Sequence, residues 1–271
     1  MGAPIRLAIK GAAGRMGRRI AVLTSERTDA VVAAAVERAD APFVGKPFSD
    51  LEPTVPAVKI TSDLAAAIAA SDVVIDFTVA PSTMADLDTY AKAGKAVVIG
   101  TTGFTNAERD QIRAKLAKIP FVLTPNMSIG VNVLFNLVRQ AAKALGDDYD
   151  VEITEAHHRM KKDAPSGTAV GLAEAAAEEL GRKYPGDAVF RQSGLIGART
   201  DREIGMQVIR GGDIVGDHTV YFIGMGERVE LTHRAHTRDT FARGAIRAAL
   251  WLAGKPAGAY DMQDVLGFRT K

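Results

Sequence analysis

Close to its beginning the sequence reads Ile5-Arg6-Leu7-Ala8-Ile9-Lys10-Gly11-Ala12-Ala13-Gly14-Arg15-Met16-Gly17. The first six residues are typical of a buried strand, and the glycines predict a tight turn into a helix over residues 14–27. Glycines at this spacing let the backbone approach a pyrophosphate, which then meets the N–H groups at the helix start. The turn departs from the usual G-x-G-x-x-G at Ala13. The role of the middle glycine, which lets the backbone approach the pyrophosphate, therefore falls on Gly14. Because glycines also mark ordinary strand-to-helix turns, the motif alone is weak evidence for a dinucleotide site.

The end of the second predicted strand, at residues 31–36, strengthens this interpretation. Glu37 follows the glycine turn by about 20 residues, where an acidic residue binds the ribose hydroxyls of an adenosine. Arg38 comes next, and a guanidinium at this place can bind a 2′-phosphate. The pair therefore permits either NADH or NADPH as coenzyme. A solvated ion pair at the strand end is the alternative interpretation of Arg38.

The first 125 residues alternate between strand-like and helix-like stretches. After the first two strands, we predict strands at residues 73–77, 96–99 and 121–124 and helices at residues 82–93 and 106–118. Apolar strands separated by helices indicate a parallel sheet that is covered on both faces. Residues 39–56 are rich in proline and are predicted as a loop.

Two loops directly follow predicted strands and are candidates for contact with a cofactor. They are Gly100-Thr101-Thr102-Gly103 and Thr124-Pro125-Asn126-Met127. Open α/β sheets bind their ligands at the carboxyl ends of the strands, which is where both loops lie in the predicted sheet. A loop of this kind, taken alone, is more often a plain connection.

The pattern changes after Pro125. The predicted elements are a helix at residues 131–145, a strand at 150–157, a helix at 168–180, strands between 206 and 235, and a helix at 240–253. We therefore predict an α/β protein with an N-terminal Rossmann-type parallel-sheet domain and a C-terminal α+β domain with an open mixed sheet. The pattern does not decide which of the two domains the last helix joins.

A polar segment precedes the predicted helix at 168–180. It reads Glu155-Ala156-His157-His158-Arg159-Met160-Lys161-Lys162-Asp163-Ala164-Pro165-Ser166-Gly167-Thr168. Cations beside an open helix start form an anion site, and a histidine next to it can act as a general acid on a carboxylate-bearing substrate. Alternation along an extended segment predicts that His157 and Lys161 point the same way.

Plainer interpretations of this segment remain. Glu155 and His157 can share a strand face and form part of a metal site, but without cysteine or a second cluster we predict no metal. The adjacent histidines can be structural, and one of Lys161 and Lys162 can belong to a solvated loop.

Composition and charge exclude several classes of protein. The 271 residues are 47% hydrophobic and 24% charged, which is typical of a globular protein. The net charge is only +2 and the cations are interspersed, so we predict no nucleic-acid partner. The absence of cysteine excludes disulfides and a cysteine nucleophile. With no apolar run near the roughly 18 residues of a membrane span and no room for a signal peptide, we predict a cytoplasmic protein without a membrane partner.

On these motifs the chain resembles the bacterial dihydrodipicolinate reductase family, also called 4-hydroxy-tetrahydrodipicolinate reductases, of lysine and diaminopimelate biosynthesis. The resemblance covers essentially the whole chain, and its most specific part runs from His157-His158-Arg159 to Pro165-Ser166-Gly167-Thr168. The other matching stretches are the glycine turn, Gly100-Thr101-Thr102-Gly103-Phe104, Gly212-Asp213-Ile214-Val215-Gly216, Arg238 and Thr240-Phe241-Ala242.

The resemblance implies a reductase that uses NADH or NADPH to convert a cyclic imine dicarboxylate, 4-hydroxy-tetrahydrodipicolinate, to tetrahydrodipicolinate. It implies a dinucleotide-binding domain of residues 1–127 and 237–271, completed by the last helix, and a substrate-binding and oligomerisation domain of residues 128–236. It also implies a homotetramer, which we expect to form through the strands between 206 and 235. Apolar residues available there are Val208, Ile214, Val220, Phe222 and Ile223.

The resemblance further implies roles for single residues. His157 and Lys161 are the expected proton donors, and His158, Gly167 and Thr168 are the expected substrate-binding residues. The expected cofactor-binding residues are Gly11, Ala12, Ala13, Gly14, Arg15, Met16, Glu37, Arg38, Gly100, Thr101, Thr102, Thr124, Pro125, Asn126 and Met127.

Two other functions remain open at this stage. One is a different oxidoreductase on a similar scaffold, such as an aspartate or diaminopimelate dehydrogenase. The other is a redox sensor that binds NAD(H) without turnover, although a sensor has no need of the dense cationic segment. An aspartate-semialdehyde dehydrogenase is excluded because it needs a cysteine nucleophile.

Overall fold

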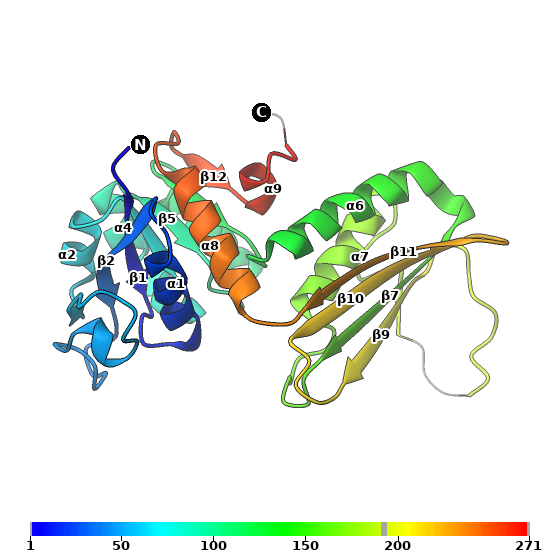
Figure 1. Ribbon diagram of the computed structural model, residues 1–271. Coiled ribbons are helices and arrows are strands. Elements are labelled where there is room, and N and C mark those ends of the chain that lie inside the picture. The colour runs from blue at the N-terminus through cyan, green and yellow to red at the C-terminus, as the bar shows by residue number, and fades with distance from the viewer. Residues whose placement is uncertain (1, 191–193, 270–271) are drawn as a thin grey trace. The chain divides into compact units, whose positions relative to one another are not determined.

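A computed structural model describes residues 2–190 and 194–269 of the chain. The chain forms two compact units (Figure 1). Unit 1 contains the described residues up to Ile129 and from Asp239 onward, and unit 2 is Gly130–Arg238. The domain limits that the resemblance implies, at 127/128 and 236/237, fall slightly earlier in the chain, and its two outer limits, residues 1 and 271, lie outside the described residues.

Unit 1 is built on a parallel sheet that has, in the described part of the chain, seven strands in the order β12-β6-β5-β4-β1-β2-β3. The strands are β1 (Ile5–Lys10), β2 (Ala30–Val36), β3 (Ile60–Thr61), β4 (Val73–Asp76), β5 (Ala96–Ile99), β6 (Pro120–Leu123) and β12 (Gly258–Tyr260). From β1 the chain first builds outward through β2 and β3, and then crosses to the other side of β1 to form β4. The glycine turn after β1 therefore lies at the topological switch point, where such sheets bind ligands. The predicted Rossmann-type sheet is confirmed.

Helices cover both faces of this sheet. They are α1 (Arg15–Ser25), α2 (Leu64–Ala69), α3 (Ala80–Ala85), α4 (Leu87–Ala93), α5 (Asn106–Lys115), α8 (Asp239–Leu252) and α9 (Met262–Val265). One apolar core joins the sheet to α1, α8 and α9, and a second joins its other face to α2, α4 and α5. Because β4 and β5 are buried on both faces, their sequences are continuous apolar runs rather than alternating ones.

The last long helix, which the sequence pattern left unassigned, belongs to unit 1. Helix α8 lies beside α1 and over the sheet (Figure 1). The guanidinium of Arg19 on α1 forms a bidentate ion pair with Asp239 at the start of α8, with N–O distances of 2.8 and 2.7 Å. The amphipathic pattern of α8 only indicates that one of its faces covers an apolar surface. The tertiary structure shows that this surface is the sheet of unit 1.

Some sequence-based expectations for unit 1 are wrong. The single helix predicted at 82–93 is two helices, α3 and α4, which meet at Asp86. The elements β3, α2, β12 and α9 were not predicted, because elements of two to six residues carry too few positions to display a period. Residues 39–56 are irregular apart from one short turn, η1 (Phe48–Asp50), in line with the predicted loop.

Unit 2 is a mixed sheet whose described strands follow the order β11-β10-β7-β9-β8. They are β7 (Asp150–His157), β8 (Ala188–Val189), β9 (Ile204–Arg210), β10 (Gly216–Ile223) and β11 (Arg228–Ala235). Strand β10 runs antiparallel to β7 and β11, whereas β9 runs parallel to β7 and β8. The predicted open mixed sheet is confirmed.

Two helices cover one face of the unit 2 sheet, namely α6 (Ile129–Leu145) and α7 (Gly167–Glu179) (Figure 1). Val220 and Phe222 are fully buried against these helices, so the expectation that they are available for assembly is wrong. Ile209 and Ile223 remain exposed. Ile209 pairs with Ala156 and therefore lies on the face away from the helices.

None of the helices in the described part of the chain combines the length and the apolar character that a membrane span requires.

Candidate active site

The glycine turn has the geometry that its sequence predicts. Gly11 adopts a positive φ of 77°, which a residue with a side chain rarely tolerates. A Cβ atom on Gly17 would lie 2.2 Å from the carbonyl oxygen of Gly11, so only glycine lets α1 start this close to the turn. Gly14 is the N-cap of α1, and no side chain in the described part of the chain caps this helix start. The N–H groups at the start of α1 are therefore available to an anion.

Glu37 and Arg38 lie beside this turn, as the sequence predicts. A carboxylate oxygen of Glu37 accepts a hydrogen bond of 3.0 Å from the backbone N–H of Ala13. The Arg38 guanidinium forms an ion pair of 3.2 Å with Asp40, and both side chains are about three-quarters exposed. An exposed pair of this kind contributes little to stability, so the guanidinium can leave Asp40 for a phosphate.

A cavity of about 590 Å³ joins these residues. Its described lining consists of Lys10, Gly11, Gly14, Val36, Glu37, Arg38, Ala39, Ser62, Leu64, Phe77, Thr78, Val79, Ser82 and Asp86. The glycine turn, the uncapped start of α1 and the acidic residue at the end of β2 fit the adenosine and pyrophosphate of a dinucleotide. Phe77, Thr78 and Val79 were missed by the sequence analysis, although they too directly follow a buried strand.

The other predicted cofactor residues do not belong to the lining described for this cavity. Gly100, Thr101 and Thr102 follow β5, and residues 124–127 follow β6, at the same edge of the sheet. Thr101 is buried, and its hydroxyl donates to Asp76 and accepts from the backbone N–H of Thr78. The Thr101 side chain therefore forms hydrogen bonds in the interior of unit 1.

A buried network of charged and hydroxyl groups lies at the ends of β1 and β4. Lys10 contacts the carboxylates of Asp76 at 3.3 Å and Asp86 at 2.6 Å. Asp76 is fully buried and also accepts hydrogen bonds from Thr78, Thr83, Tyr90 and Thr101. Burial, reinforced by the charge of Asp76 and the hydrogen bond to it, raises the pKa of Tyr90 well above its usual value. Tyr90 therefore stays a neutral donor to the carboxylate.

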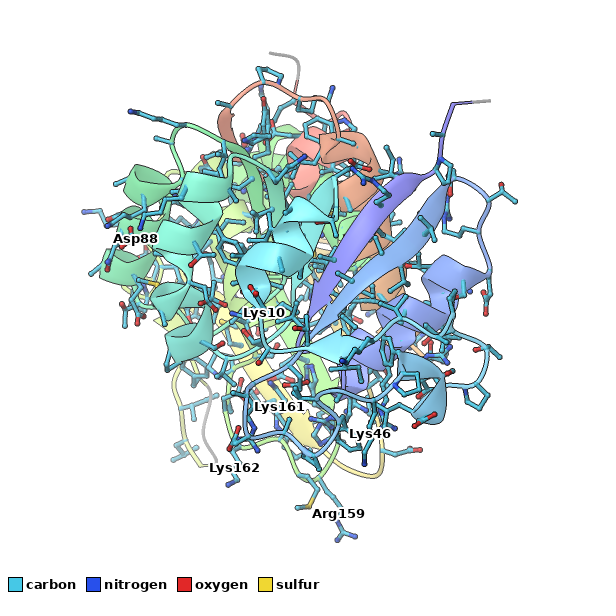
Figure 2. All side chains as sticks on the ribbon, turned by 90° about the vertical axis from the view of Figure 1, so that its left-hand side faces the viewer. Lys10, Lys46, Asp88, Arg159, Lys161 and Lys162 are labelled. Atoms are coloured by element: carbon cyan, nitrogen blue, oxygen red, sulfur yellow. The ribbon has the colours of Figure 1, made fainter. Side chains whose placement is uncertain are left out.

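This network was also missed by the sequence analysis. Lys10 lies inside unit 1 (Figure 2) and is only 7% exposed, whereas a lysine at a strand end is usually solvated. The available signal was the presence of opposite charges, Lys10 and Asp76, at the ends of two strands that are neighbours in a sheet of this order.

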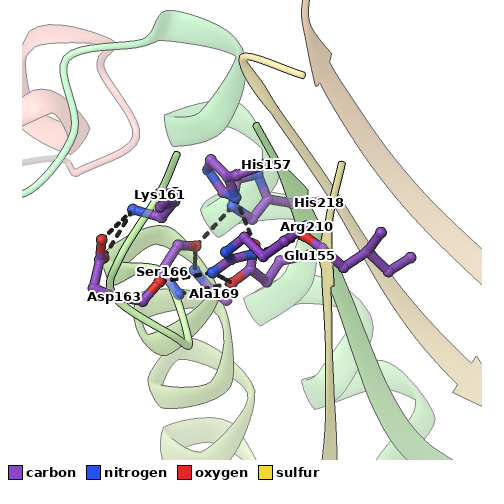
Figure 3. A network of polar contacts seen from close by, with 9 residues as sticks. Glu155, His157, Lys161, Asp163, Ser166, Ala169, Arg210 and His218 are labelled. Atoms are coloured by element: carbon purple, nitrogen blue, oxygen red, sulfur yellow. Dashed lines mark hydrogen bonds and ion pairs between the residues drawn. The ribbon is translucent and has the colours of Figure 1, made fainter. Parts of the chain in front are cut away.

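In unit 2, strand β7 carries Glu155 and His157 on the face covered by α7. Glu155 accepts hydrogen bonds from Nδ1 of His157 at 2.5 Å, from the guanidinium of Arg210 at 2.7 and 2.8 Å, and from the backbone N–H of Ser166 at 3.0 Å (Figure 3). Burial on its own raises the pKa of this carboxyl, but the hydrogen bonds from His157, Arg210 and Ser166 outweigh burial and lower the pKa to about 2. Glu155 is therefore an anion at all ordinary pH values.

The chain turns directly after His157. The backbone N–H of His158 donates to Ile214, that of Arg159 donates to Gly212, and that of Lys161 returns to the carbonyl oxygen of His158. The expectation that His157 and Lys161 share one side of an extended segment is therefore wrong, because β7 ends at His157. The stretch Gly212–Gly216 holds the turn in place by backbone hydrogen bonds.

The cations of this turn differ in their surroundings. Arg159 and Lys162 are exposed, and Arg159 points away from the turn (Figure 2). Lys161 is only 19% exposed and forms an ion pair of 2.8 Å with Asp163 (Figure 3). Lys161 is thus the cation of this group that is held in one place.

Helix α7 begins at the same cluster. Ser166 is its N-cap, and the Ser166 hydroxyl accepts a hydrogen bond from the N–H of Ala169. Gly167 and Thr168 form the first turn, so their N–H groups point out of the helix start. The structure therefore brings His157, Lys161, Gly167 and Thr168, which the sequence singled out, into one region of unit 2.

His218 completes the cluster and was not singled out by its sequence. Nε2 of His218 lies 3.0 Å from the Ser166 hydroxyl, and the His157 and His218 rings meet edge to face at 5.1 Å. Burial, followed by the charge of His157, lowers the pKa of His218 to about 3, so the ring is neutral at neutral pH. His218 faces Glu155 in the register of β10 and β7, a pairing that no local pattern reveals.

Among residues 2–190 and 194–269, no group of three or more histidine, aspartate or glutamate side chains has the arrangement of a metal site. Both Glu155 oxygens are already engaged by Arg210, His157 and Ser166.

Comparison with known proteins gives consistent matches over the chain. The family model for the N-terminus of dihydrodipicolinate reductase matches residues 5–127, and the model for its C-terminus matches residues 130–266. A 4-hydroxy-tetrahydrodipicolinate reductase of Geotalea uraniireducens is 55% identical over 267 residues, which are 98% of this chain and 100% of that protein. One of Syntrophotalea carbinolica is 52% identical over 266 residues, with 98% and 100% covered.

A solved structure agrees with these matches. Dipicolinate-bound dihydrodipicolinate reductase from Paenisporosarcina sp. TG-14 is 25% identical, has a TM-score of 0.75, and is aligned over 96% of this chain and 98% of its own. Together with two family models that adjoin each other in the sequence and relatives more than half identical over their full length, this shows that the chain belongs to the dihydrodipicolinate reductase family.

Proposed function

We propose that the protein catalyses the reduction of 4-hydroxy-tetrahydrodipicolinate to tetrahydrodipicolinate in lysine and diaminopimelate biosynthesis, with NADH or NADPH as reductant, in the cytoplasm. The observation that carries the proposal is the cluster in unit 2, where a histidine held by a buried carboxylate lies beside Lys161 and the start of α7 (Figure 3). A cyclic imine dicarboxylate needs both a proton donor and an anion site, and this cluster offers both. Family membership supports the same reaction.

Unit 1 provides the residues that would hold the coenzyme. The N–H groups of residues 11–16 and the start of α1 bind the pyrophosphate, and Glu37 binds the ribose hydroxyls. The loops at 100–102 and 124–127, at the same sheet edge, take the remainder of the coenzyme. When bound, the nicotinamide supplies the hydride.

Unit 2 provides the residues that would hold and protonate the substrate. The N–H groups of Gly167 and Thr168 bind one carboxylate, with Lys161 and His158 as further donors. The 4-hydroxyl group of the substrate leaves as water, which gives a conjugated imine, and addition of a hydride to this imine leaves an electron-rich, enamine-like ring. His157 then protonates the ring carbon while Lys161 stabilises the charge near the ring nitrogen.

Turnover of the natural substrate tests this function. The condensing synthase, fed with pyruvate and aspartate semialdehyde, generates the substrate in place, and NADPH or NADH oxidation is followed at its absorbance band. Rapid oxidation that needs the synthase is the expected result. Oxidation of aspartate or diaminopimelate with NAD(P)⁺ would instead favour a dehydrogenase, and coenzyme binding without any turnover would favour a sensor.

Coenzyme choice should depend on Arg38. The Arg38→Ala variant is expected to bind NADPH roughly 10–100-fold more weakly, as for the loss of a charged hydrogen bond, and NADH nearly as well as the wild type. Asp40→Ala is the matched control, because it removes the ion-pair partner but leaves the guanidinium. Dissociation constants from nicotinamide fluorescence check this. Equal losses for both coenzymes would show that Arg38 does not bind the 2′-phosphate.

Assembly should involve the face of the unit 2 sheet that α6 and α7 do not cover. Ile209 is 54% exposed there and Ile223 is 37% exposed, and a unit of this size cannot bury both faces of its sheet by itself. We expect a homotetramer of four times 28.7 kDa by light scattering. A stable 28.7 kDa monomer at micromolar concentration would exclude it.

A further inference from the structure

The carboxylate of Glu155, a residue that is 1% exposed, accepts hydrogen bonds from three partners at once. They are His157, the N-cap residue of α7 and Arg210. These partners come from three segments: β7 itself, the N-cap position of α7 and β9. A carboxylate has about four lone-pair positions, and four N–H groups occupy them here. Glu155 therefore has no free position for a substrate or a metal ion, and any role in the reaction is exerted through its partners.

The first consequence concerns His157. Because Glu155 is an anion and can only accept, Nδ1 of His157 must carry the hydrogen of their contact. Nε2 is then the ring atom that can release or take a proton. A Cβ atom on Gly216 would lie 3.1 Å from this Nε2, so glycine at that position leaves room beside it.

The second consequence concerns the start of α7. The backbone N–H of Ser166 donates to the other Glu155 oxygen, which fixes the N-cap residue. The N–H groups of Gly167 and Thr168 follow immediately and take their direction from it. The same carboxylate therefore determines both the direction of the histidine ring and the position of the anion-binding helix start.

Arg210 completes the arrangement. It lies opposite His157 in the register of β9 and β7, and its guanidinium binds both Glu155 oxygens and the carbonyl oxygen of Asp163. A bidentate guanidinium holds the carboxylate in one plane and keeps it ionised. Through its hydrogen bond to Asp163, Arg210 also attaches the loop that carries Lys161 to β9.

We propose that Glu155, held by Arg210, is a positioning residue of the reductase: it sets the tautomer and direction of His157 and aligns the carboxylate-binding start of α7 with it. This rests on the proposed function, in which His157 is the proton donor. The competing view is a buried ion pair that only contributes to folding, and such pairs contribute little net stability in many proteins. The experiment must therefore measure something that a folding role leaves unchanged.

A kinetic cycle of four proteins does so: the wild type, Glu155→Gln, His157→Gln and the double variant. Glu155→Gln is expected to lower kcat at least about 10-fold, as for residues that orient a functional histidine. In the His157→Gln background the same change should lower kcat less than about twofold, because the histidine through which Glu155 affects the protonation step is gone, whereas a shift of the α7 start changes KM. Losses that multiply in the double variant would overturn the proposal, as would a Glu155→Gln enzyme with near wild-type kcat.

Glu152→Gln is the matched control on the same strand. Glu152 faces the other side of β7 and also pairs with an arginine, Arg199, at 3.2 Å. It is expected to keep wild-type kcat. Far-UV circular dichroism, which follows both units, reports whether each variant is folded.

The tautomer can be measured in the wild-type protein and needs no folded Glu155 variant. In ¹⁵N-histidine-labelled protein at mildly alkaline pH, His157 should show a protonated Nδ1 and an unprotonated Nε2, with His157→Gln identifying its signals. The opposite tautomer would overturn the proposal. If the wild type does not reduce the substrate, or His157→Gln is fully active, the proposed function fails instead, whatever the tautomer.

Discussion

Replacing His157 with glutamine is expected to lower kcat by roughly 10²–10⁴-fold, the usual contribution of a general acid. Glutamine retains a hydrogen bond to Glu155 but cannot deliver a proton to the ring carbon. Binding of NADPH should be nearly unchanged, because the coenzyme residues belong to unit 1. Steady-state kinetics and the coenzyme dissociation constant from fluorescence measure the two effects. His236→Gln, which changes an exposed histidine just after β11, is the control and should retain wild-type kcat.

Replacement of Lys161 is expected to affect the same protonation step as replacement of His157. Lys161→Ala should lower kcat and raise KM, since it removes a held cation from the site of a dianion. The double variant with His157→Gln should lose less than the product of the two single losses, because both residues serve one protonation step. If His157→Gln retains more than about half of the wild-type kcat, against the general-acid range above, the histidine is structural and the proton comes from Lys161 or water.

Removal of the buried Asp76 carboxylate should give the largest loss of stability. Asp76→Ala leaves Lys10 without one of its two acidic partners and leaves the buried Tyr90 hydroxyl without its acceptor. Breaking a buried ion pair from one side costs about 3–5 kcal/mol of unfolding free energy. Asp72→Ala is a closely matched control, because Arg6 and Asp72 pair between the same two segments but are 50% and 33% exposed. Its expected cost is below about 1 kcal/mol.

Urea unfolding monitored by tryptophan fluorescence measures this difference in unit 1 alone. The single tryptophan, Trp251, lies on α8 and contacts the Tyr260 ring at 5.1 Å, so its emission reports on unit 1. Far-UV circular dichroism follows both units together. Similar unfolding free energies for Asp76→Ala and Asp72→Ala would mean that the network around Asp76 is not the stabilising centre described above.

The sequence alone determined the class of fold and the places where ligands are expected. The strands at Ala96–Ile99 and Asp150–His157 were predicted with their observed bounds. A strand between two helical layers consists of an unbroken apolar run, whereas a strand with one covered face alternates between apolar and polar residues. The sequence pattern therefore predicts which faces of a strand are buried. The glycine turn was predicted for a related reason, because a positive φ and a close approach of two backbone segments tolerate few residues other than glycine.

Only the tertiary structure decided which polar groups meet. Arg210 and His218 are far in the sequence from the segment of Glu155 and Ser166, and the four residues converge because of how β7, β9 and β10 are paired and where α7 begins. Strand register and helix docking are collective results of burying whole faces, so no local pattern encodes them. The same reason explains why α8 joins unit 1 and why Lys10 and Asp76 form a buried pair. The sequence thus named the segments of the site, and packing over long distances decided which of their side chains act together.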